Sequence, residues 1–373
     1  MKFVAIRQNI KDAISIIQRA AGENVNLPIL KNTLIEAENN IITFIATNLE
    51  IAIKTFVSGK IIENGKVTVP VSLLSNLIGN LQTDRLNFET KGTNGSNLEI
   101  KTDNYDAVVQ GASAEDFPIT PKIANMKSYI EIKAVFLREA IQQTTVAAQF
   151  SDIRPELNSI LFDFSLETIK LAATDGFRLA EKTIPASVFT AHGMDPFRVL
   201  VPLKTANELS RILMNDEDVK IYHDENQILF KTEKMELISR LSEGSFPDYS
   251  ALIPPGFVME LTINQDEFLN ALKLAGIFSQ KNNEVSIVVH PNKKAIEIVS
   301  ADQSYGENKY VLPAKIKGDQ AEKIFNVKYL ADALRSIQGE DIFLGVQEEA
   351  NPALLKSPTD SSYFYILKPI MKA

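Results

Sequence analysis

Side chains that could carry out chemistry are few and widely scattered in this sequence. The three histidines, His192, His223 and His290, show none of the short-range pairing, such as HExxH, that a zinc site uses. The chain contains no cysteine, which excludes disulfides and thiolate chemistry and is typical of a reducing compartment. The sequence therefore predicts no metal site built on histidine or cysteine.

Phosphate loops and hydrolase elbows are also missing from the sequence. Gly59-Lys60 and Gly65-Lys66 lack the preceding glycine pattern and the following Ser or Thr of a phosphate loop. No Gly-x-Ser-x-Gly nucleophile elbow occurs. The acidic run from Asn215 to Asp218 could hold a hard cation, but its place between an expected helix and the strand VKIYH favours a solvated connector.

Carboxylates can still converge from distant positions, so the absence of motifs does not by itself exclude an enzyme. Asp163 and Asp175 are the acids around which an enzyme acting on nucleic acid or sugars, on a repeated β-rich scaffold, could be built. We keep that enzyme as the alternative function, ahead of a structural or adhesive β protein. The main expectation is a protein with no catalytic residue, no cofactor and no metal.

Composition indicates a globular protein of several domains. The 373 residues suit two or three domains, and 45% hydrophobic with 23% charged residues is ordinary for a soluble chain. The N-terminal segment MKFVAIRQNIKDAISIIQRAA has charges throughout, so it is neither a signal peptide nor a membrane span. We expect a cytoplasmic protein with no membrane partner. The net charge of −8 argues against nucleic-acid binding by bulk electrostatics, so any such binding needs locally positive surfaces.

The sequence repeats itself at long intervals. Asn48, Asp175 and Asp302 occupy the same place in three similar strand–turn–strand phrases, each 127 residues after the last. Each third of the chain opens with a strand that runs into a helix, from Phe3, Ile130 and Met259, and a second strand–helix follows within it. An interval of this length indicates whole homologous domains rather than solenoid repeats. The expected domains are residues 1–125, 126–252 and 253–373.

Each third also divides internally. The turns at Thr47, Thr174 and Ala301 have partners at Thr102, Thr232 and Thr359, each inside a hairpin-like alternation of polar and apolar residues. The predicted unit is strand–helix–three strands, twice per domain and six times per chain. We therefore expect an α+β fold of three tandem homologous domains.

The six expected helices are slightly positive although the chain is acidic. In the first, Ile10, Ala13, Ile14 and Ile17 follow the 3.6-residue period of a core-facing stripe. The basic residues of the six helices outnumber six acids and supply the locally positive charge that any binding of nucleic acid would need: Lys11, Arg19, Arg138, Lys204, Arg211, Lys273, Lys328 and Arg335. A solvated helical face explains any one of them equally well.

The ordered phrases MKF, LPILKNTLIEA, TVP, DFP, AATDGFRLA and FPDY, at domain spacing over the whole chain, resemble the sliding-clamp family, the β subunit of bacterial DNA polymerase III. The resemblance implies a DNA-clamp fold in which two chains join head to tail as a homodimeric ring, with sheets outside and helices around duplex DNA. Such a ring holds DNA by topology, so a weak, sequence-independent contact with phosphates suffices.

The resemblance also implies partner proteins: the DNA polymerase III catalytic subunit, the clamp loader, and other polymerases and repair proteins with clamp-binding peptides. Their peptides would enter an apolar cleft. The matching positions are Leu157, Thr174, Gly176, Phe177, Arg178, Leu179, Pro247, Leu252, Ile366, Leu367, Pro369, Ile370 and Met371. Leu157 and Leu179 could instead belong to the core, and Gly176 could be an ordinary turn glycine.

Several positions depart from the family pattern. Pro155-Glu156 stands where some members have a pair of aromatic residues, Ala251 where a basic residue is frequent, and Lys368 where an apolar side chain is usual. Two loop positions that are basic in some relatives are Asn24 and Ser72. We expect these changes to alter the affinity and peptide preference of the cleft and to weaken the contact with DNA.

Ring closure would use an edge strand in the first domain and the end of a helix in the third. The matching residues are Tyr105, Val108, Val109, Ile277 and Phe278. An unpaired edge strand invites association, and pairing it across an interface removes that liability. Core packing is the alternative for Ile277 and Phe278.

Overall fold

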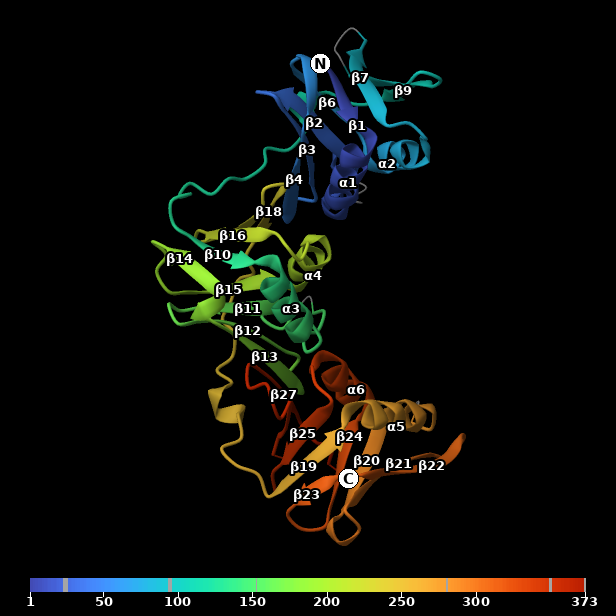
Figure 1. Ribbon diagram of the computed structural model, residues 1–373, viewed down its shortest axis with the longest axis vertical. Helices are drawn as coiled ribbons and strands as arrows, with labels where there is room; N and C mark the ends of the chain where they lie inside the picture. The colour runs from blue at the N-terminus through green and yellow to red at the C-terminus, as the bar shows by residue number, and fades with distance from the viewer. Residues whose placement is uncertain (23–25, 93–95, 152, 280, 349–350, 372–373) are drawn as a thin grey trace. The chain divides into compact units, whose positions relative to one another are not determined.

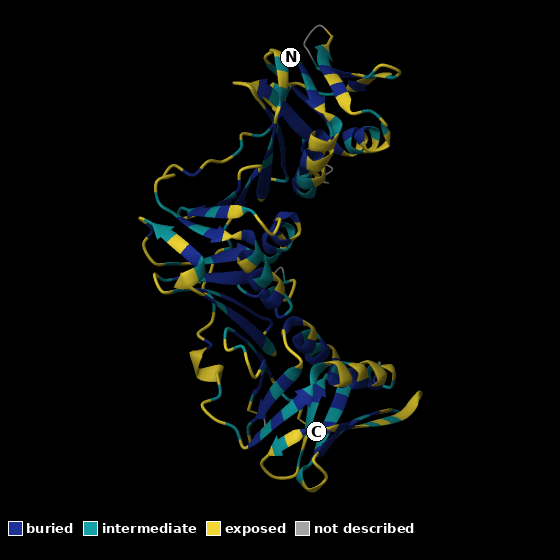
Figure 2. Ribbon diagram, in the orientation of Figure 1, coloured by how far each residue is buried: buried dark blue, intermediate teal, exposed yellow. Residues whose placement is uncertain are grey.

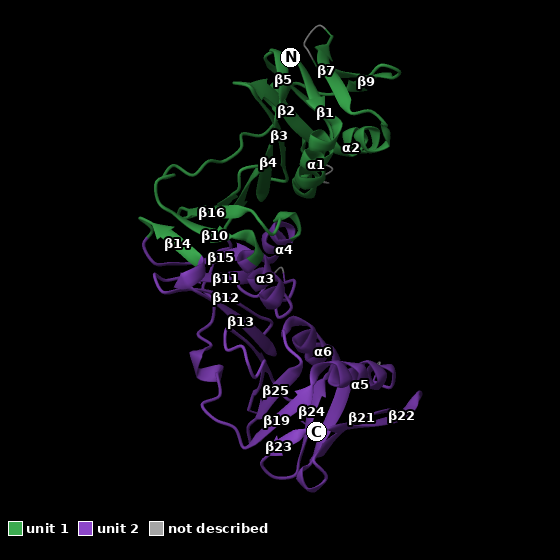
Figure 3. Ribbon diagram, in the orientation of Figure 1, with its two compact units in different colours: residues 1–135, 189–194, 211–241 green, residues 136–188, 195–210, 242–373 purple. Residues whose placement is uncertain are grey.

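The computed structural model describes residues 1–22, 26–92, 96–151, 153–279, 281–348 and 351–371. The chain forms two compact units (Figure 3). Unit 1 contains residues 1–135, 189–194 and 211–241, and unit 2 contains residues 136–188, 195–210 and 242–373. Among the described residues no helix combines the length and the apolar character needed to pass through a bilayer.

The same order of elements occurs three times along the chain (Figure 1). The first third contains β1 (Lys2–Ile6), α1 (Arg7–Ile17), β2 (Asn32–Glu38), β3 (Ile41–Thr47), β4 (Ile51–Val57), β5 (Gly59–Glu63), β6 (Gly65–Pro70), α2 (Val71–Asn80), β7 (Arg85–Lys91), β8 (Asn97–Lys101) and β9 (Asp106–Gln110). The second contains β10 (Tyr129–Lys133), α3 (Ala134–Thr145), β11 (Ser159–Phe164), β12 (Thr168–Thr174), β13 (Arg178–Pro185), β14 (Phe189–His192), β15 (Phe197–Pro202), α4 (Leu203–Ile212), β16 (Asp218–His223), β17 (Gln227–Lys231) and β18 (Met235–Arg240). The third contains β19 (Met259–Asn264), α5 (Gln265–Ile277), β20 (Glu284–His290), β21 (Ala295–Asp302), β22 (Gly306–Pro313), β23 (Lys315–Lys317), β24 (Ala321–Asn326), α6 (Val327–Ser336), β25 (Asp341–Val346), β26 (Ala353–Lys356) and β27 (Tyr363–Leu367).

The predicted strand–helix–three-strand unit is confirmed, with one addition. A further short strand follows the first unit of each third: β5, β14 and β23. Each of these pairs antiparallel with the first strand of its own third, β1, β10 or β19. The α+β class and the threefold repetition of elements are therefore correct, and the sequence analysis missed one strand per third.

Each unit contains one nine-stranded sheet and one smaller sheet, all antiparallel in the pairs described. In unit 1 the large sheet has the order β14-β10-β16-β17-β18-β4-β3-β2-β6 and the small one β5-β1-β7-β8-β9. In unit 2 the orders are β15-β11-β12-β13-β27-β26-β25-β19-β23 and β22-β21-β20-β24. The large sheets join strands from different thirds of the chain, at β18–β4 and at β13–β27.

The compact units do not coincide with the predicted domains. The position between residues 125 and 126 lies inside unit 1, and the position between 252 and 253 lies inside unit 2. Backbone pairing of β18 with β4 and of β13 with β27 explains why strands of different thirds cluster together. The domain boundaries therefore stay a prediction.

The helices form where apolar residues recur with the helical period, and a side-chain cap precedes α5 and α6. Ile10, Ala13, Ile14 and Ile17 of α1 are buried, as the spacing predicts. The side chain of Asn326 caps α6 by accepting hydrogen bonds from the backbone N–H of Lys328 at 3.0 Å and of Tyr329 at 3.3 Å. Figure 2 shows mostly buried strands, with exposed residues on loops and along one face of helices such as α1 and α5.

The three similar phrases form hairpin turns stabilised by the same type of side-chain bond. Asp175 Oδ1 accepts hydrogen bonds from the backbone N–H of Phe177 at 2.9 Å and of Arg178 at 3.0 Å, between β12 and β13. Asn48 Oδ1 accepts both corresponding bonds in its own turn, and Asp302 Oδ1 accepts the first of them, from the residue two positions ahead. An Asx side chain that bonds the backbone two residues ahead favours such a turn. The predicted hairpin at Thr174-Asp175 is confirmed.

Candidate peptide groove and nucleic-acid interface

Unit 2 has an apolar hollow of about 180 Å³ beside the strand pair β13–β27. The β12–β13 turn, the segment after β18 and the end of β27 form its wall. Nine of the residues predicted for a peptide cleft line it: Leu157, Thr174, Gly176, Phe177, Arg178, Leu179, Pro247, Leu252 and Ile366. The sequence analysis did not assign five further lining residues to the cleft: Arg154, Asp248, Tyr249, Pro352 and Lys368. We call this hollow the groove.

Four predicted cleft residues do not line the groove: Leu367, Pro369, Ile370 and Met371. Leu367 is fully buried and follows Ile366 along β27, so it points to the opposite face of the sheet. The prediction that its side chain lines the cleft is corrected on this ground. The backbone N–H of Ile370 donates to the carbonyl oxygen of Ile324 at 2.8 Å, which attaches the tail to β24.

The turn at the groove has a fixed backbone and an outward aromatic ring. Thr174 Oγ1 donates to the carbonyl oxygen of Arg178 at 2.6 Å and accepts from the N–H of Gly176 at 3.0 Å. Gly176 has φ of +89°, in the region that favours glycine. Phe177 is 62% exposed, an unusually high value for a large apolar side chain. The turn therefore presents Phe177 to solvent at the rim of the groove.

The floor of the groove is an apolar cluster with one strong polar bond. Leu161, Ala172, Leu179, Leu200, Tyr249 and Ile366 form the buried cluster, with Phe246 and Phe364 packed against it. The Tyr249 hydroxyl donates to Glu181 Oε2 at 2.5 Å. Burial, together with this bond to Glu181, raises the pKa of the Tyr249 phenol. The groove therefore offers a mainly apolar surface, with polar groups at its rim.

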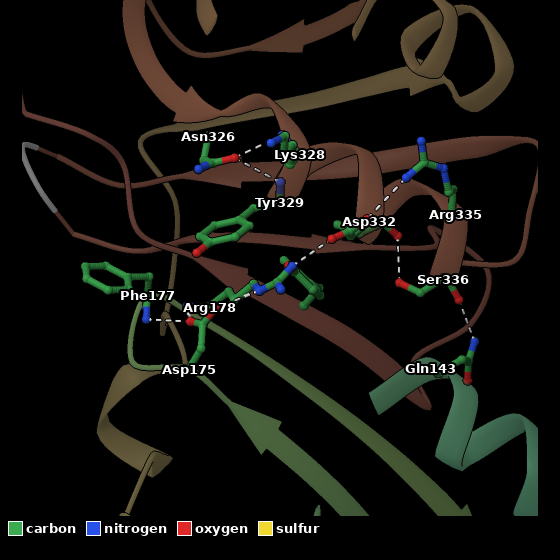
Figure 4. A network of polar contacts seen from close by, with 12 residues as sticks. Gln143, Asp175, Phe177, Arg178, Asn326, Lys328, Tyr329, Asp332, Arg335 and Ser336 are labelled. Carbon is green, nitrogen blue, oxygen red and sulfur yellow. Dashed lines mark hydrogen bonds and ion pairs between the residues drawn. The ribbon is translucent and has the colours of Figure 1, made fainter. Parts of the chain in front are cut away.

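Arg178 is the centre of a polar network next to the groove (Figure 4). Its Nε lies 2.8 Å from Asp175 Oδ2, and its Nη1 lies 2.8 Å from Asp332 Oδ2 on α6. Its guanidinium group stacks over the Tyr329 ring at 4.1 Å, and Nη1 donates to the Tyr365 hydroxyl at 3.3 Å. Burial alone would lower the pKa of Arg178, but its contacts with Tyr365, Asp332 and Asp175 outweigh burial and raise that pKa.

The network continues along α6. Asp332 Oδ1 lies 3.2 Å from Arg335 Nη1, so Asp332 has an arginine on each carboxylate oxygen. The side chain of Gln143 donates to the carbonyl oxygen of Ser336 at 2.8 Å, and the Tyr363 hydroxyl donates to the carbonyl oxygen of Gln143 at 2.9 Å. Helix α6 is therefore attached both to the groove turn and to α3.

The eight basic residues proposed to face DNA lie on helices, as predicted, and their exposure differs. Six are exposed, and Arg19 and Arg138 are half-buried. Arg19 lies in a short 3-10 helix, Gln18–Ala20, directly after α1. Their position on helices does not test contact with DNA, which stays a prediction. Asn24 lies outside the described residues.

Three of the noted departures can be placed around the groove. Glu156 pairs with Arg154 Nε at 2.9 Å, at the groove rim. Lys368 lines the groove and is exposed, while its backbone N–H donates to the carbonyl oxygen of Phe177 at 2.9 Å. Ala251 is exposed in the 3-10 helix Ser250–Leu252. The groove thus keeps an apolar floor, and its rim carries charges of both signs, with Arg154, Asp248 and Lys368 among its lining residues.

The residues predicted for ring closure lie at an edge strand of unit 1 and at the C-terminal end of helix α5 in unit 2. β9 is an edge strand of unit 1, where Val108 is 55% exposed and Val109 is 2% exposed. The side chain of Val109 therefore belongs to the core of its own unit, and its part in an interface, through the backbone of this edge strand, stays a prediction. Ile277, at the end of α5, is exposed and Phe278 is half-buried. β22, which the sequence analysis did not assign to the interface, is an edge strand of unit 2.

The described part of the chain brings few potential metal ligands together. No group of three or more His, Asp and Glu side chains in that part of the chain is placed to hold a metal ion. Asp163 pairs with Arg198 at 3.0 Å and Asp175 with Arg178 at 2.8 Å, so each candidate catalytic carboxylate lies in an ion pair.

Within the described residues, six copies of one strand–helix–three-strand unit, arranged as three repeats, define the sliding-clamp class of fold. The sliding clamp of Bacillus subtilis has a similar structure, with a TM-score of 0.93 and 26% identity over 100% of both chains. A Pseudomonas aeruginosa sliding clamp bound to griselimycin gives a TM-score of 0.93 at 24% identity, again over 100% of both chains.

The chain belongs to the DNA polymerase III beta subunit family. Its residues 1–121, 131–248 and 250–371 match the N-terminal, central and C-terminal domain models of that family. The beta sliding clamp of Synechococcus elongatus is 27% identical over 377 residues, covering 99% of both chains, and that of Bacillus subtilis is 26% identical over 382 residues, with the same coverage. The resemblance seen in the sequence is thus confirmed.

Proposed function

We propose that this chain is a processivity factor that encircles duplex DNA as a head-to-tail homodimeric ring and tethers a DNA polymerase. The observation that carries the proposal is the match of all three family domains in order along the chain. Relatives matched over nearly their full length are named beta sliding clamp. The family acts as an accessory factor, and we propose no catalytic role, cofactor or metal for this chain.

The charge distribution supports a ring that slides. The chain has a net charge of −8, while its helices present exposed cations such as Lys11, Lys204 and Lys273. A closed ring is retained by topology, so only weak contact with phosphates is needed, and strong affinity would hinder movement. Acidic outer surfaces would repel DNA and favour the central path.

The free sheet edges support closure of the ring between two copies. Edge strand β9 of one chain could pair with edge strand β22 of the other, because each lacks a strand on one side in its own sheet. Exposed Val108 and Ile277 would supply apolar contacts at such an interface. Two identical junctions would then close the ring.

The groove supports the binding of partner proteins through short apolar peptides. Its apolar floor, rigid turn and exposed Phe177 are suited to an extended peptide. We propose the DNA polymerase III catalytic subunit, the clamp loader, and other polymerases and repair proteins as the partners. The exposed Lys368 at the rim favours peptides that carry an acidic residue. We propose that the protein binds these partners in the cytoplasm.

Retention on DNA tests the proposal. The protein is loaded on nicked circular DNA with a clamp loader, and the retained fraction is measured before and after the circle is linearised. Retention by topology predicts loss of the protein on linearisation. Equal retention on both forms would instead indicate direct binding and contradict the ring. Sedimentation should show a dimer at micromolar concentration.

A further inference from the structure

Asp332 on α6 shares its carboxylate between two arginines in different surroundings (Figure 4). Oδ2 accepts a hydrogen bond from Arg178 Nη1 at 2.8 Å, and Oδ1 accepts one from Arg335 Nη1 at 3.2 Å. Arg178 belongs to the turn that lines the groove. Arg335 is one of the exposed helix cations proposed to face DNA. One carboxylate therefore contacts both candidate binding sites.

The two arginines differ in how firmly they are held. The side chain of Arg178 is 11% exposed and also bonds Asp175 and Tyr365, so its position is fixed by several groups. The side chain of Arg335 is 55% exposed and is free to move toward another anion. If Arg335 binds a phosphate and releases Asp332, Arg178 becomes the one arginine of the two that still pairs with the Asp332 carboxylate.

We propose that Asp332 couples the peptide groove to the DNA contact of α6, with Arg178 as the positioning residue. This inference rests on the proposed function, because it requires Arg335 to contact a DNA phosphate. When Arg335 binds phosphate, the bond between Asp332 and Arg178 strengthens and holds the Thr174–Arg178 turn in place. When Arg178 moves away from Asp332, the Asp332 carboxylate pairs with Arg335 alone. Asp332 then competes with the DNA phosphate for Arg335.

The sign of the coupling follows from these contacts. Arg178 neutralises a carboxylate that would otherwise repel DNA or occupy Arg335. DNA contact and an ordered groove turn should therefore favour each other, and linkage requires the effect to be equal in both directions. Since Asp332 and Arg335 are partly exposed, the expected effect of the ion pair is modest, about two- to fivefold in binding.

A double-mutant cycle with DNA binding as the readout tests the proposal. The affinity of the full-length protein for a short fluorescent DNA duplex is measured by anisotropy at low salt, for the wild type, Arg178→Lys, Asp332→Asn and the double variant. Arg178→Lys keeps the charge but cannot hold Asp175, Asp332 and Tyr365 at once. We expect it to weaken DNA binding about two- to fivefold in the wild-type background and to have no effect in the Asp332→Asn background.

Matched variants distinguish failure of the proposed DNA contact of α6 from failure of the coupling alone. Arg198→Lys changes an arginine that does not line the groove and whose partner is Asp163, and it should leave DNA binding unchanged. If Arg335→Gln has no effect on DNA binding, the proposed DNA contact of α6 fails. If Arg335→Gln weakens binding but the effect of Arg178→Lys is the same in both backgrounds, the coupling alone is overturned.

A second variant keeps the proposal testable if Arg178→Lys does not fold. Tyr329→Leu removes the ring beneath the guanidinium group and loosens Arg178 without altering any charge. It should weaken DNA binding in the same direction, and again only when Asp332 is present. Unchanged DNA binding in a folded Tyr329→Leu variant would contradict the proposal.

Discussion

The hydroxyl of Tyr249 lies 2.5 Å from Glu181 Oε2 and attaches the segment after β18 to strand β13 beneath the groove. Both residues are buried. The bond therefore satisfies a carboxylate inside unit 2 and fixes one wall of the groove relative to its floor.

Replacement of Tyr249 by Phe should destabilise the protein because Glu181 loses its hydroxyl donor. We expect a loss of about 1–3 kcal/mol, visible as a lower melting temperature in calorimetry. Tyr222→Phe is the control, since Tyr222 is similarly buried but belongs to unit 1 and does not line the groove. Equal shifts for the two variants would show that the bond to Glu181 contributes little.

Phe177→Ala should reduce binding in the groove while leaving the fold intact. The ring is 62% exposed, so its removal should change the free energy of unfolding by less than about 0.5 kcal/mol. Loss of an aromatic anchor should weaken ligand binding about tenfold or more. A short, extended apolar peptide is a suitable probe, with its binding measured by calorimetric titration. Leu166→Ala, at a side chain that is also 62% exposed, should leave the affinity unchanged.

Gly176→Ala should destabilise the protein although there is room for the added methyl group. Apart from Gly176 and its two chain neighbours, no residue has an atom within 4 Å of the position a Cβ would take, but φ is +89°. The expected cost is about 1 kcal/mol of backbone strain, measured by chemical denaturation. Gly256→Ala also has open space and lacks a positive φ, so it should be neutral or slightly stabilising. A neutral Gly176→Ala would mean that the turn relaxes easily.

The pKa of Glu89 should be low and should depend on its lysine partners. Hydrogen bonds from Lys91 and then Lys2 lower the pKa of Glu89 to about 2, from an ordinary value of 4.5. Because the folded-state pKa is depressed, the stabilisation is present above pH 4.5 and is lost as the pH falls through about 2. Carboxyl NMR titration should show Lys91→Met raising this pKa. Lys66→Met, which removes a partner of Glu36, should not change it.

Charge placed at the proposed ring junction should give monomers. Val108 is exposed on edge strand β9, and a Glu there would have to be buried at the interface. We expect Val108→Glu to sediment as a monomer and to be lost from nicked circular DNA. Ile62→Glu, at a 51% exposed residue on the opposite edge strand β5, should remain a dimer. A monomeric wild type would refute the junction itself.

Local patterns in the sequence were sufficient to predict the repeated unit, the core stripe of α1 and the hairpin at Asp175. They did not predict β23, because three residues, Lys315–Lys317, give no periodic signal and are ordered by pairing with β19. Leu367 was misplaced, although strand alternation after Ile366 could have shown that only one of the two faces the groove. The Tyr249–Glu181 and Arg178–Asp332 contacts join residues 68 and 154 positions apart, and no local pattern reports such partners.

The joining of β13 to β27 limits how the polypeptide can be divided. Residues Arg178–Lys182 form their backbone ladder with Tyr363–Leu367, at the far end of the chain. A recombinant fragment that stops near residue 252 would lack β27 and expose the unpaired edge of β13. A strand of another molecule could then pair with that edge. Protease nicking in the segment after β18 should therefore leave two pieces that stay together until a denaturant separates them.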